Sequence, residues 1–369
     1  MRERLRALVP STASVLLALV GCFFALALTR GFAIATDAFA AMAAGALGDW
    51  SRFLDTGDAA AVLRPLGESS VKAALLTLTG LSVAVAFRVG LFNIGAQGQL
   101  MVGALAAAVV GAGVSWPAVL HLPAALGAAA VAGALWAAVP AELKLRRGVH
   151  EVISTIMLNW VAVSLVENWL VTGPLRAVAS GDNSISGTAQ VQISAVLPRL
   201  LGDVSRLNGG IILAVVVALA MWLFFTRFVR GYEWRCVGLS PEAARAAGID
   251  PSRATREAML LSGALAGLAG AVLVLGTELK YPSTLGATYG FDGIAMALIG
   301  QGHPLGVLAS AGLFGALRAG GTRMQLFGIH KSFPELIQGL ALLLVAAKLV
   351  WERLASRLFP SRTRDGAPP

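Results

Sequence analysis

The stretch EAMLLSGALAGLAGAVLVLG, residues 257–276, decides the fold class. It has one charged side chain, Glu257, in twenty residues, which is about the length that crosses a bilayer as a helix. Gly263, Gly267 and Gly270 are small residues of the kind that let two helix backbones approach closely inside a membrane. The stretch therefore predicts a tightly packed transmembrane helix.

Apolar runs of similar length continue along the whole chain. Its 369 residues are 57% hydrophobic and 13% charged, about half the charged fraction of a soluble domain. We therefore expect an all-α integral membrane protein with about ten transmembrane helices in a single domain, residues 1–369. The runs 285–301 and 304–320 are short and separated only by QGHP, so they form either two full spans or one broken pair. The predicted spans are 12–33, 69–88, 92–113, 117–141, 151–172, 209–227, 257–276, 285–301, 304–320 and 334–351.

The net charge of +9 comes from basic residues that lie mostly between the apolar runs. This placement indicates membrane topology rather than nucleic-acid binding, because short cytoplasmic loops are enriched in Lys and Arg. An even number of spans places both termini on one side, and the charge bias makes that side the cytoplasm. The basic loop 228–257 is then cytoplasmic, whereas the loops 35–68 and 173–208 lie outside.

The sequence lacks the common signatures of enzymatic chemistry. It contains no GxxxxGK[ST] phosphate-binding loop, no HExxH, no Cys/His cluster and no GxSxG. We therefore expect no catalytic residues, no metal site and no ATPase site in this chain.

One apolar region contains an unusual cluster of amides. GLFNIGAQGQL, residues 90–100, includes Asn93, Gln97 and Gln99 among glycines. Polar side chains inside a membrane must find partners in the protein or line a wet cavity. The clustering favours a broken helix beside a solute path over simple hydrogen bonds between helices. For the isolated Asn159 an interhelical hydrogen bond is the favoured interpretation, with solute contact as the alternative.

A second glycine-rich segment contains an acid. YGFDGIAMALIGQGHP, residues 289–304, includes Asp292. The spans 92–113 and 285–301 are each the third span of one half of the chain, and glycine-interrupted spans at matching positions point to a transport site. Asp292 either contributes to that path or forms a structural ion pair with an arginine such as Arg318.

The loop between the sixth and seventh spans contains a predicted short helix, PEAARAAGI. Ser240 is a suitable N-cap, Pro241 fits the first turn, and Gly248 suits the C-terminus. The helix is either a solvated connector or a docking surface for a soluble partner.

Five motifs occur in an order that resembles a known family. They resemble the permease subunits of bacterial ABC importers of the branched-chain amino acid and ribose type, and most of all the nucleoside-importer branch. The resemblance covers roughly residues 60–350. The motifs are GLFNIGAQGQLMVGA (90–104), HEVISTIMLNW (150–160), SPEAARAAGI (240–249), SGALAGLAGA (262–271) and GFDGIAMALIGQGHPLGVLASAGLFGALRAGG (290–321).

The resemblance implies a type II importer permease-like bundle in the bacterial inner membrane. Two ABC ATPase subunits would bind ATP and dock on the cytoplasmic side, so this chain would need no cofactor of its own. A second permease, identical or homologous, and an extracytoplasmic substrate-binding lipoprotein would complete the importer. The positions that match the family's coupling segment are Glu242, Ala243, Arg245 and Gly248. Gln97 departs from the family pattern, which often has an acid there.

From these observations we expect a permease that moves nucleosides or similar solutes by ATP hydrolysis in partner subunits. Neutral amides suit a solute that donates and accepts hydrogen bonds without a strong charge. The alternatives are a sugar or branched-chain amino acid ABC permease, or an ion-coupled secondary transporter. The residues predicted to line the path are Asn93, Gln97, Gln99, Asn159 and Asp292.

Overall fold

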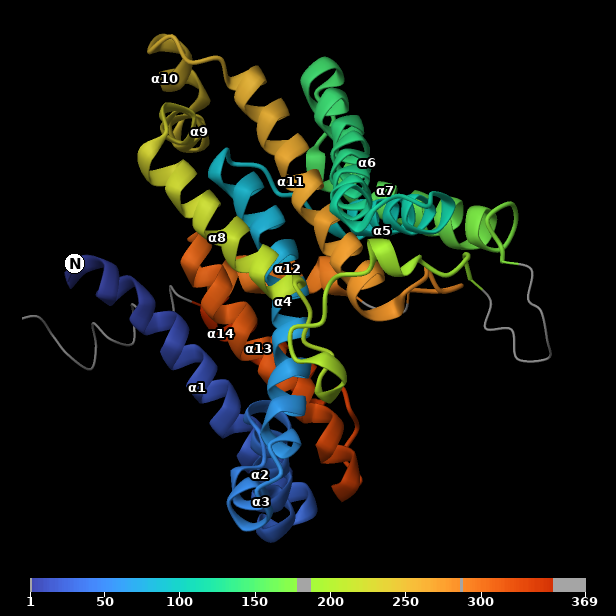
Figure 1. The fold of residues 1–369 in the computed structure, drawn as a ribbon. Helices are drawn as coiled ribbons and strands as arrows, with labels where there is room; N and C mark the ends of the chain where they lie inside the picture. Colours follow the sequence, from blue (N-terminus) through green and yellow to red (C-terminus); the bar gives the residue numbers. More distant parts are fainter. Residues whose placement is uncertain (1, 178–186, 286–287, 348–369) are drawn as a thin grey trace, which may run out of the picture.

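The computed structural model describes residues 2–177, 187–285 and 288–347, and these residues are mostly helical (Figure 1). Within these ranges extended chain pairs only at isolated bridges, Gly187 with Pro282 and Arg199 with Asn208. The first half contains α1 (Arg2–Arg30), α2 (Phe32–Leu47), α3 (Trp50–Thr56), α4 (Ala60–Arg88), α5 (Ala96–Gly113), α6 (Ala118–Arg147) and α7 (Glu151–Ala162). The second half contains α8 (Gly210–Arg227), α9 (Val229–Leu239), α10 (Pro241–Ala246), α11 (Pro251–Leu273), α12 (Tyr289–Ile299), α13 (Pro304–Met324) and α14 (Phe333–Ala346).

Seven of the described helical segments are long and apolar enough to cross a membrane, or eight if the bent pair α2 and α3 counts as one span. The predicted number of about ten is therefore not confirmed. The seven correspond to the first seven predicted spans: Ala13–Arg30, Ala60–Arg88, Ala96–Gly113, Ala118–Arg147, Glu151–Val171, Gly210–Arg227 and Pro251–Glu278.

The last three predicted spans do not correspond to any of these seven helices. The run 285–301 forms only the eleven-residue α12, which ends where Gln301 and Gly302 adopt left-handed backbone. The predicted sharp turn at QGHP is thus present. Helix α13 is 21 residues long, but its glycines and arginines lower its hydropathy. Helix α14 covers the described part of the span 334–351, whose end lies outside the described residues.

The region 35–68, predicted to be an outer loop, is helical for most of its length. It contains most of α2, all of α3 and the first turns of α4. Asp37 is the only charged residue in the alanine-rich α2; it is exposed, whereas the buried face of the helix packs against α13. Helices α2 and α3 meet at an angle of 71°. The predicted loop 228–257 likewise contains α9, α10 and the start of α11. In the predicted loop 173–208, the described residues form short 3₁₀ turns and isolated bridges, and residues 178–186 lie outside the description.

Helices α4 and α11 form the centre of the bundle. Their most apolar windows are 83% and 78% buried, whereas those of α1, α6, α7 and α8 are only 22–28% buried. Helix α11 packs against α4, α5 and α6, and α4 packs against α12 and α13. The mostly exposed helices are therefore the ones available to lipid or to partner subunits.

The predicted close packing of the glycine motif in α11 is confirmed. A Cβ added at Gly263 or Gly267 would collide with the backbone of α6, at Gly133 and Ala129 respectively. A Cβ at Gly270 would collide with the backbone of α5. These contacts hold α5, α6 and α11 close together.

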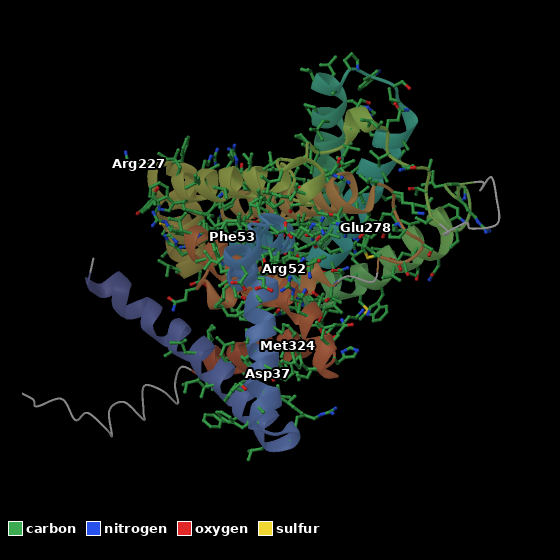
Figure 2. The ribbon with its side chains drawn as sticks, turned by 60° about the horizontal axis from the view of Figure 1, so that its bottom comes forward. Asp37, Arg52, Phe53, Arg227, Glu278 and Met324 are labelled. Carbon is green, nitrogen blue, oxygen red and sulfur yellow. The ribbon has the colours of Figure 1, made fainter. Side chains whose placement is uncertain are left out.

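The bundle has two distinct ends (Figure 1). We call the end with α9 and α10 the α10 end, and the opposite end, with α2 and α3, the α2 end. Figure 2 places Asp37 of α2 and Met324 of α13 toward the α2 end, away from Arg227, where α8 leads into α9. Helix α4 runs between the two ends, from Ala60 to Arg88.

Candidate functional site

The amide cluster lies where the chain leaves helical conformation between α4 and α5. Residues 91–94 have no regular secondary structure, yet Asn93 is fully buried. Its side-chain oxygen accepts a hydrogen bond from the Gly95 backbone N–H (2.9 Å), and its amide nitrogen donates to Gln99 Oε1 (2.9 Å) and to Ser262 Oγ of α11 (2.8 Å). The predicted break in the helix is therefore confirmed, and Asn93 replaces part of the hydrogen bonding that the break removes.

Asn159 of α7 supports the same break from the other side. Its side-chain oxygen accepts from the Gly98 backbone N–H (2.8 Å), and its nitrogen donates to the Ile94 carbonyl (3.0 Å). The Gly98 N–H belongs to the first turn of α5 and the Ile94 carbonyl to the irregular segment. Hydrogen bonds within the helix satisfy neither of them. The favoured interhelical hydrogen bond of Asn159 is thus present. Its alternative, solute contact, stays a prediction.

Gln97 connects the two glycine-rich segments 90–100 and 289–304. Its Oε1 accepts a hydrogen bond from the Gly290 backbone N–H at the start of α12 (2.9 Å). A Cβ at Gly290 would collide with the backbone of Gln97, so only glycine permits this approach. The segments 90–100 and 289–304 therefore meet inside the bundle, whereas the transport site that their matching positions indicated stays a prediction.

Asp292 of α12 forms the ion pair that the sequence offered as one alternative. Its Oδ2 lies 2.7 Å from Arg318 Nη1 of α13, and both side chains are nearly buried. Its Oδ1 accepts from Gln338 Nε2 of α14 (3.1 Å), and its Oδ2 also accepts from Thr288 Oγ1 (3.2 Å). The Arg318 guanidinium also lies 5.9 Å from the ring centroid of Tyr289.

The cluster of Asp292, Arg318 and Gln338 contains hydrogen-bonding atoms that have no partner in the described part of the chain. Arg318 Nε and Gln338 Oε1 are both buried and have no hydrogen-bond partner among the described residues. A donor and an acceptor without partners are costly in a bundle interior, and a ligand or ordered water that bonds them would remove this cost. The contribution of Asp292 to a solute path stays a prediction.

The predicted coupling positions lie together at the α10 end. Ser240 caps α10 by accepting from the Ala243 N–H (3.2 Å), and Gly248, with φ of +82°, ends the turn in left-handed conformation. Glu242, Ala243, Arg245 and Gly248 are all exposed, and Ala244 is the buried residue of α10. The helix thus projects from the bundle and leaves most of its surface uncovered.

The chain is similar to known transport proteins over most of its length. The model of the branched-chain amino acid transport system permease component family matches residues 66–346. The chain belongs to this family. No solved structure is detectably similar to it.

The permease resembles several curated relatives of the family. It is 40% identical to the guanosine ABC transporter permease protein NupP of Bacillus subtilis, over 76% of this chain and 81% of the relative. It is 34% identical to the glucose ABC transporter permease protein TsgB13 of Haloferax volcanii, over 82% and 81%. It is 33% identical to the nucleoside ABC transporter permease protein NupB of Lactococcus lactis, over 78% and 81%. The resemblance to the nucleoside branch is therefore confirmed, and the chain is a permease subunit of an ABC transporter.

Sequence reasoning missed residues that complete both polar clusters. Ser262 lies inside the α11 glycine motif, where it was interpreted only as packing, yet it bonds Asn93 and the Ser82 carbonyl. Gln338 is a single amide in the last predicted span, and the rule applied to Asn93 could have identified it. Lys144, paired with Glu151 across the α6–α7 turn, had no signal beyond its charge.

Proposed function

We propose that this permease moves nucleosides or closely related solutes across a bacterial inner membrane. The observation that carries the proposal is the 40% identity, over three quarters of the chain, to a permease named for guanosine. A nucleoside is uncharged and presents many hydrogen-bond donors and acceptors. It therefore suits a bundle whose buried polar side chains, among the described residues, are mostly hydroxyls and amides rather than charged groups.

Two features of the bundle support a solute path near α5 and α12. The irregular segment before α5 is the kind of broken backbone that membrane proteins tolerate only when protein or a cavity surrounds it. The unpaired Arg318 Nε and Gln338 Oε1 offer one donor and one acceptor beside Asp292. We propose that the path runs past Asn93, Gln97, Gln99, Asn159 and Asp292, with the Asp292 cluster as the part that contacts solute.

We propose that α10 is the surface on which an ATPase subunit docks. In α10 only Ala244 is buried. The four predicted coupling residues are exposed at the α10 end: Glu242, Ala243, Arg245 and Gly248. Ten basic residues with defined positions lie at this end, and we place it in the cytoplasm by the positive-inside rule. They are Arg88, Lys144, Arg146, Arg147, Arg227, Arg230, Arg235, Arg245, Arg253 and Arg256.

The proposed assembly contains two ABC ATPase subunits, a second permease and an extracytoplasmic substrate-binding lipoprotein. ATP binds to the ATPase subunits and not to this chain. We place both termini in the cytoplasm. Since the ten-span count is not confirmed, this orientation depends on the charges of the α10 end and on α1, which runs toward the α2 end at Arg30.

A sugar is the second candidate solute, because the glucose permease of Haloferax volcanii is 34% identical over 82% of this chain. Uptake into proteoliposomes containing the cognate ATPases and binding protein distinguishes the two. Unlabelled guanosine, adenosine and uridine should suppress uptake of labelled guanosine, whereas glucose, ribose and leucine should not. Competition by glucose or leucine alone would refute the nucleoside proposal.

A further inference from the structure

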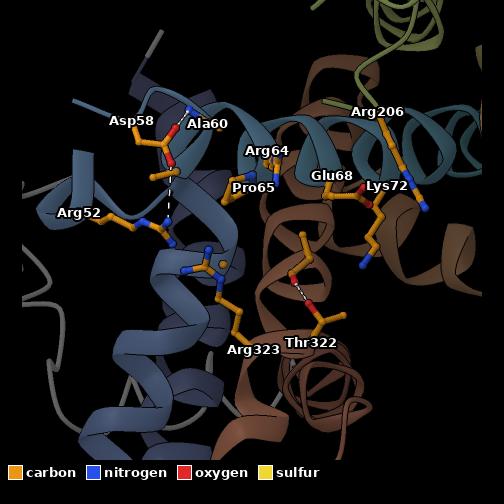
Figure 3. Close-up of a pocket in the computed structure, with 13 residues that line it drawn as sticks. Arg52, Asp58, Ala60, Arg64, Pro65, Glu68, Lys72, Arg206, Thr322 and Arg323 are labelled. Atoms are coloured by element: carbon orange, nitrogen blue, oxygen red, sulfur yellow. Dashed lines mark hydrogen bonds and ion pairs between the residues drawn. The ribbon is translucent and has the colours of Figure 1, made fainter. Parts of the chain in front are cut away.

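A cavity of about 520 Å³ opens at the α2 end, between α2, the α3–α4 connection, the first half of α4 and the end of α13 (Figure 3). Five of its lining side chains are basic and two are acidic. Figure 3 shows them converging from separate segments, with Arg206 reaching in from the chain before α8. The charged lining residues are Arg52, Arg64, Lys72, Arg206, Arg323, Asp58 and Glu68.

The carboxylates near this cavity leave hydrogen-bond donors of the arginines without a close acceptor. Charge-assisted hydrogen bonds between a guanidinium and an oxyanion are about 2.7–2.9 Å long. The three ion pairs around the cavity have N···O distances of 3.6–3.7 Å, so they leave guanidinium N–H groups available to a ligand. The pairs are Arg52 with Asp58, Arg206 with Glu68, and Arg323 with Asp49.

Two of the basic side chains have no carboxylate partner within 4 Å in the described part of the chain. Arg64 donates only to the Val204 carbonyl (3.3 Å), and Lys72 donates to the Arg318 carbonyl (3.0 Å). Lys72 is partly buried, where an uncompensated charge is expensive. Both carbonyl contacts hold the side chains in place, and neither positive charge forms an ion pair within 4 Å among the described residues.

We propose that this cavity binds a phosphate-bearing anion, held by Arg64 and Lys72 with Arg52, Arg206 and Arg323 around it. The planar fork of arginine and the point charge of lysine both match phosphate oxygens. The recess has the volume of a small-molecule site, and its donors point inward from several segments. The same chemistry is offered by a free phosphate group and by the headgroup of an anionic phospholipid.

Transport of an uncharged solute does not require such a site. In the proposed orientation the α2 end is extracytoplasmic, where the positive-inside rule gives no reason to gather basic residues. The extracytoplasmic location of the α2 end rests on the proposed function. The cavity and the lack of a carboxylate within 4 Å of Arg64 and Lys72 in the described ranges do not.

The test compares the permease with its Arg64→Gln/Lys72→Gln variant in phosphatidylcholine nanodiscs at constant ionic strength. Titration calorimetry with inorganic phosphate should show binding to the parent that is weakened about tenfold or more in the variant. In a second arm, native mass spectrometry should show phosphatidylglycerol retained by the parent and lost from the variant. Phosphate binding in the first arm assigns a free anion, and retention in the second arm without it assigns a lipid headgroup. Either result supports the site.

Two further variants separate binding from folding. Arg147→Gln/Arg227→Gln removes two exposed arginines at the α10 end and should leave both readouts unchanged. Glu68→Gln removes a competing carboxylate and should strengthen phosphate binding about threefold, an effect that loss of structure cannot produce. Binding that is unchanged in both the Arg64/Lys72 variant and Glu68→Gln would overturn the proposal. The proposal would also be overturned if a soluble acidic protein bound at this cavity while neither phosphate nor phosphatidylglycerol bound. Since no transport is measured, failure of this site would leave the proposed solute untouched.

Discussion

Asn93→Ala tests how the break between α4 and α5 is stabilised. The substitution leaves the buried Gly95 N–H without its acceptor and removes the bonds to Gln99 and Ser262. An unsatisfied buried donor costs about 1–3 kcal/mol. Side-chain hydrogen bonds inside a membrane protein average about 0.6 kcal/mol each. We therefore expect the free energy of unfolding to fall by about 2–4 kcal/mol.

The assay is unfolding in mixed micelles by increasing the SDS fraction, followed by tryptophan fluorescence. Asn168→Ala is the matched control, because Asn168 is exposed and its side chain should contribute less than about 0.5 kcal/mol. A double-mutant cycle with Ser262→Ala should give a coupling energy of about 0.6 kcal/mol between the irregular segment and α11. If Asn93→Ala unfolds within about 0.5 kcal/mol of the control, the amide does not stabilise the break and our reasoning is wrong.

Three other substitutions test separate parts of the structure. Gly267→Leu should abolish folded protein in size-exclusion chromatography, because any Cβ there collides with the α6 backbone, whereas Gly312→Leu on an open face should not. Gly248→Pro should uncouple ATPase activity from uptake while the assembly stays intact, since proline cannot adopt the φ of +82°; unchanged uptake would show that α10 is only a connector. Asp292→Asn should lower the free energy of unfolding by about 3 kcal/mol by leaving a buried arginine charge, and adding Arg318→Gln should restore part of that loss; no restoration would contradict the pairing.

The sequence was sufficient to predict features in which a residue type has one dominant physical role. Long apolar runs predicted the seven spans, and the α11 glycines predicted close packing. The clustering of intramembrane amides with glycines predicted a break in the helix, and residues 91–94 are indeed irregular. The Asp292–Arg318 pair was one of two named alternatives, and geometry decided that it forms.

Other features depended on tertiary packing that periodicity does not reveal. Helix α2 was missed because nearby acids at 37–58 suggested a solvated loop, although the alanine-rich segment packs against α13. Helix α12 ends two residues before the predicted end at 301, where Gln301 and Gly302 adopt left-handed backbone. The basic cavity at the α2 end unites residues from 52 to 323, and no local pattern could place them together.

The most direct test of the account measures what drives transport. Proteoliposomes with this permease, its second permease subunit and the binding protein should accumulate labelled guanosine only when the ATPase subunits and ATP are also present. The permease alone should accumulate none, with or without an imposed proton or sodium gradient. Uphill accumulation by the permease alone under an ion gradient would contradict the account and identify an ion-coupled transporter.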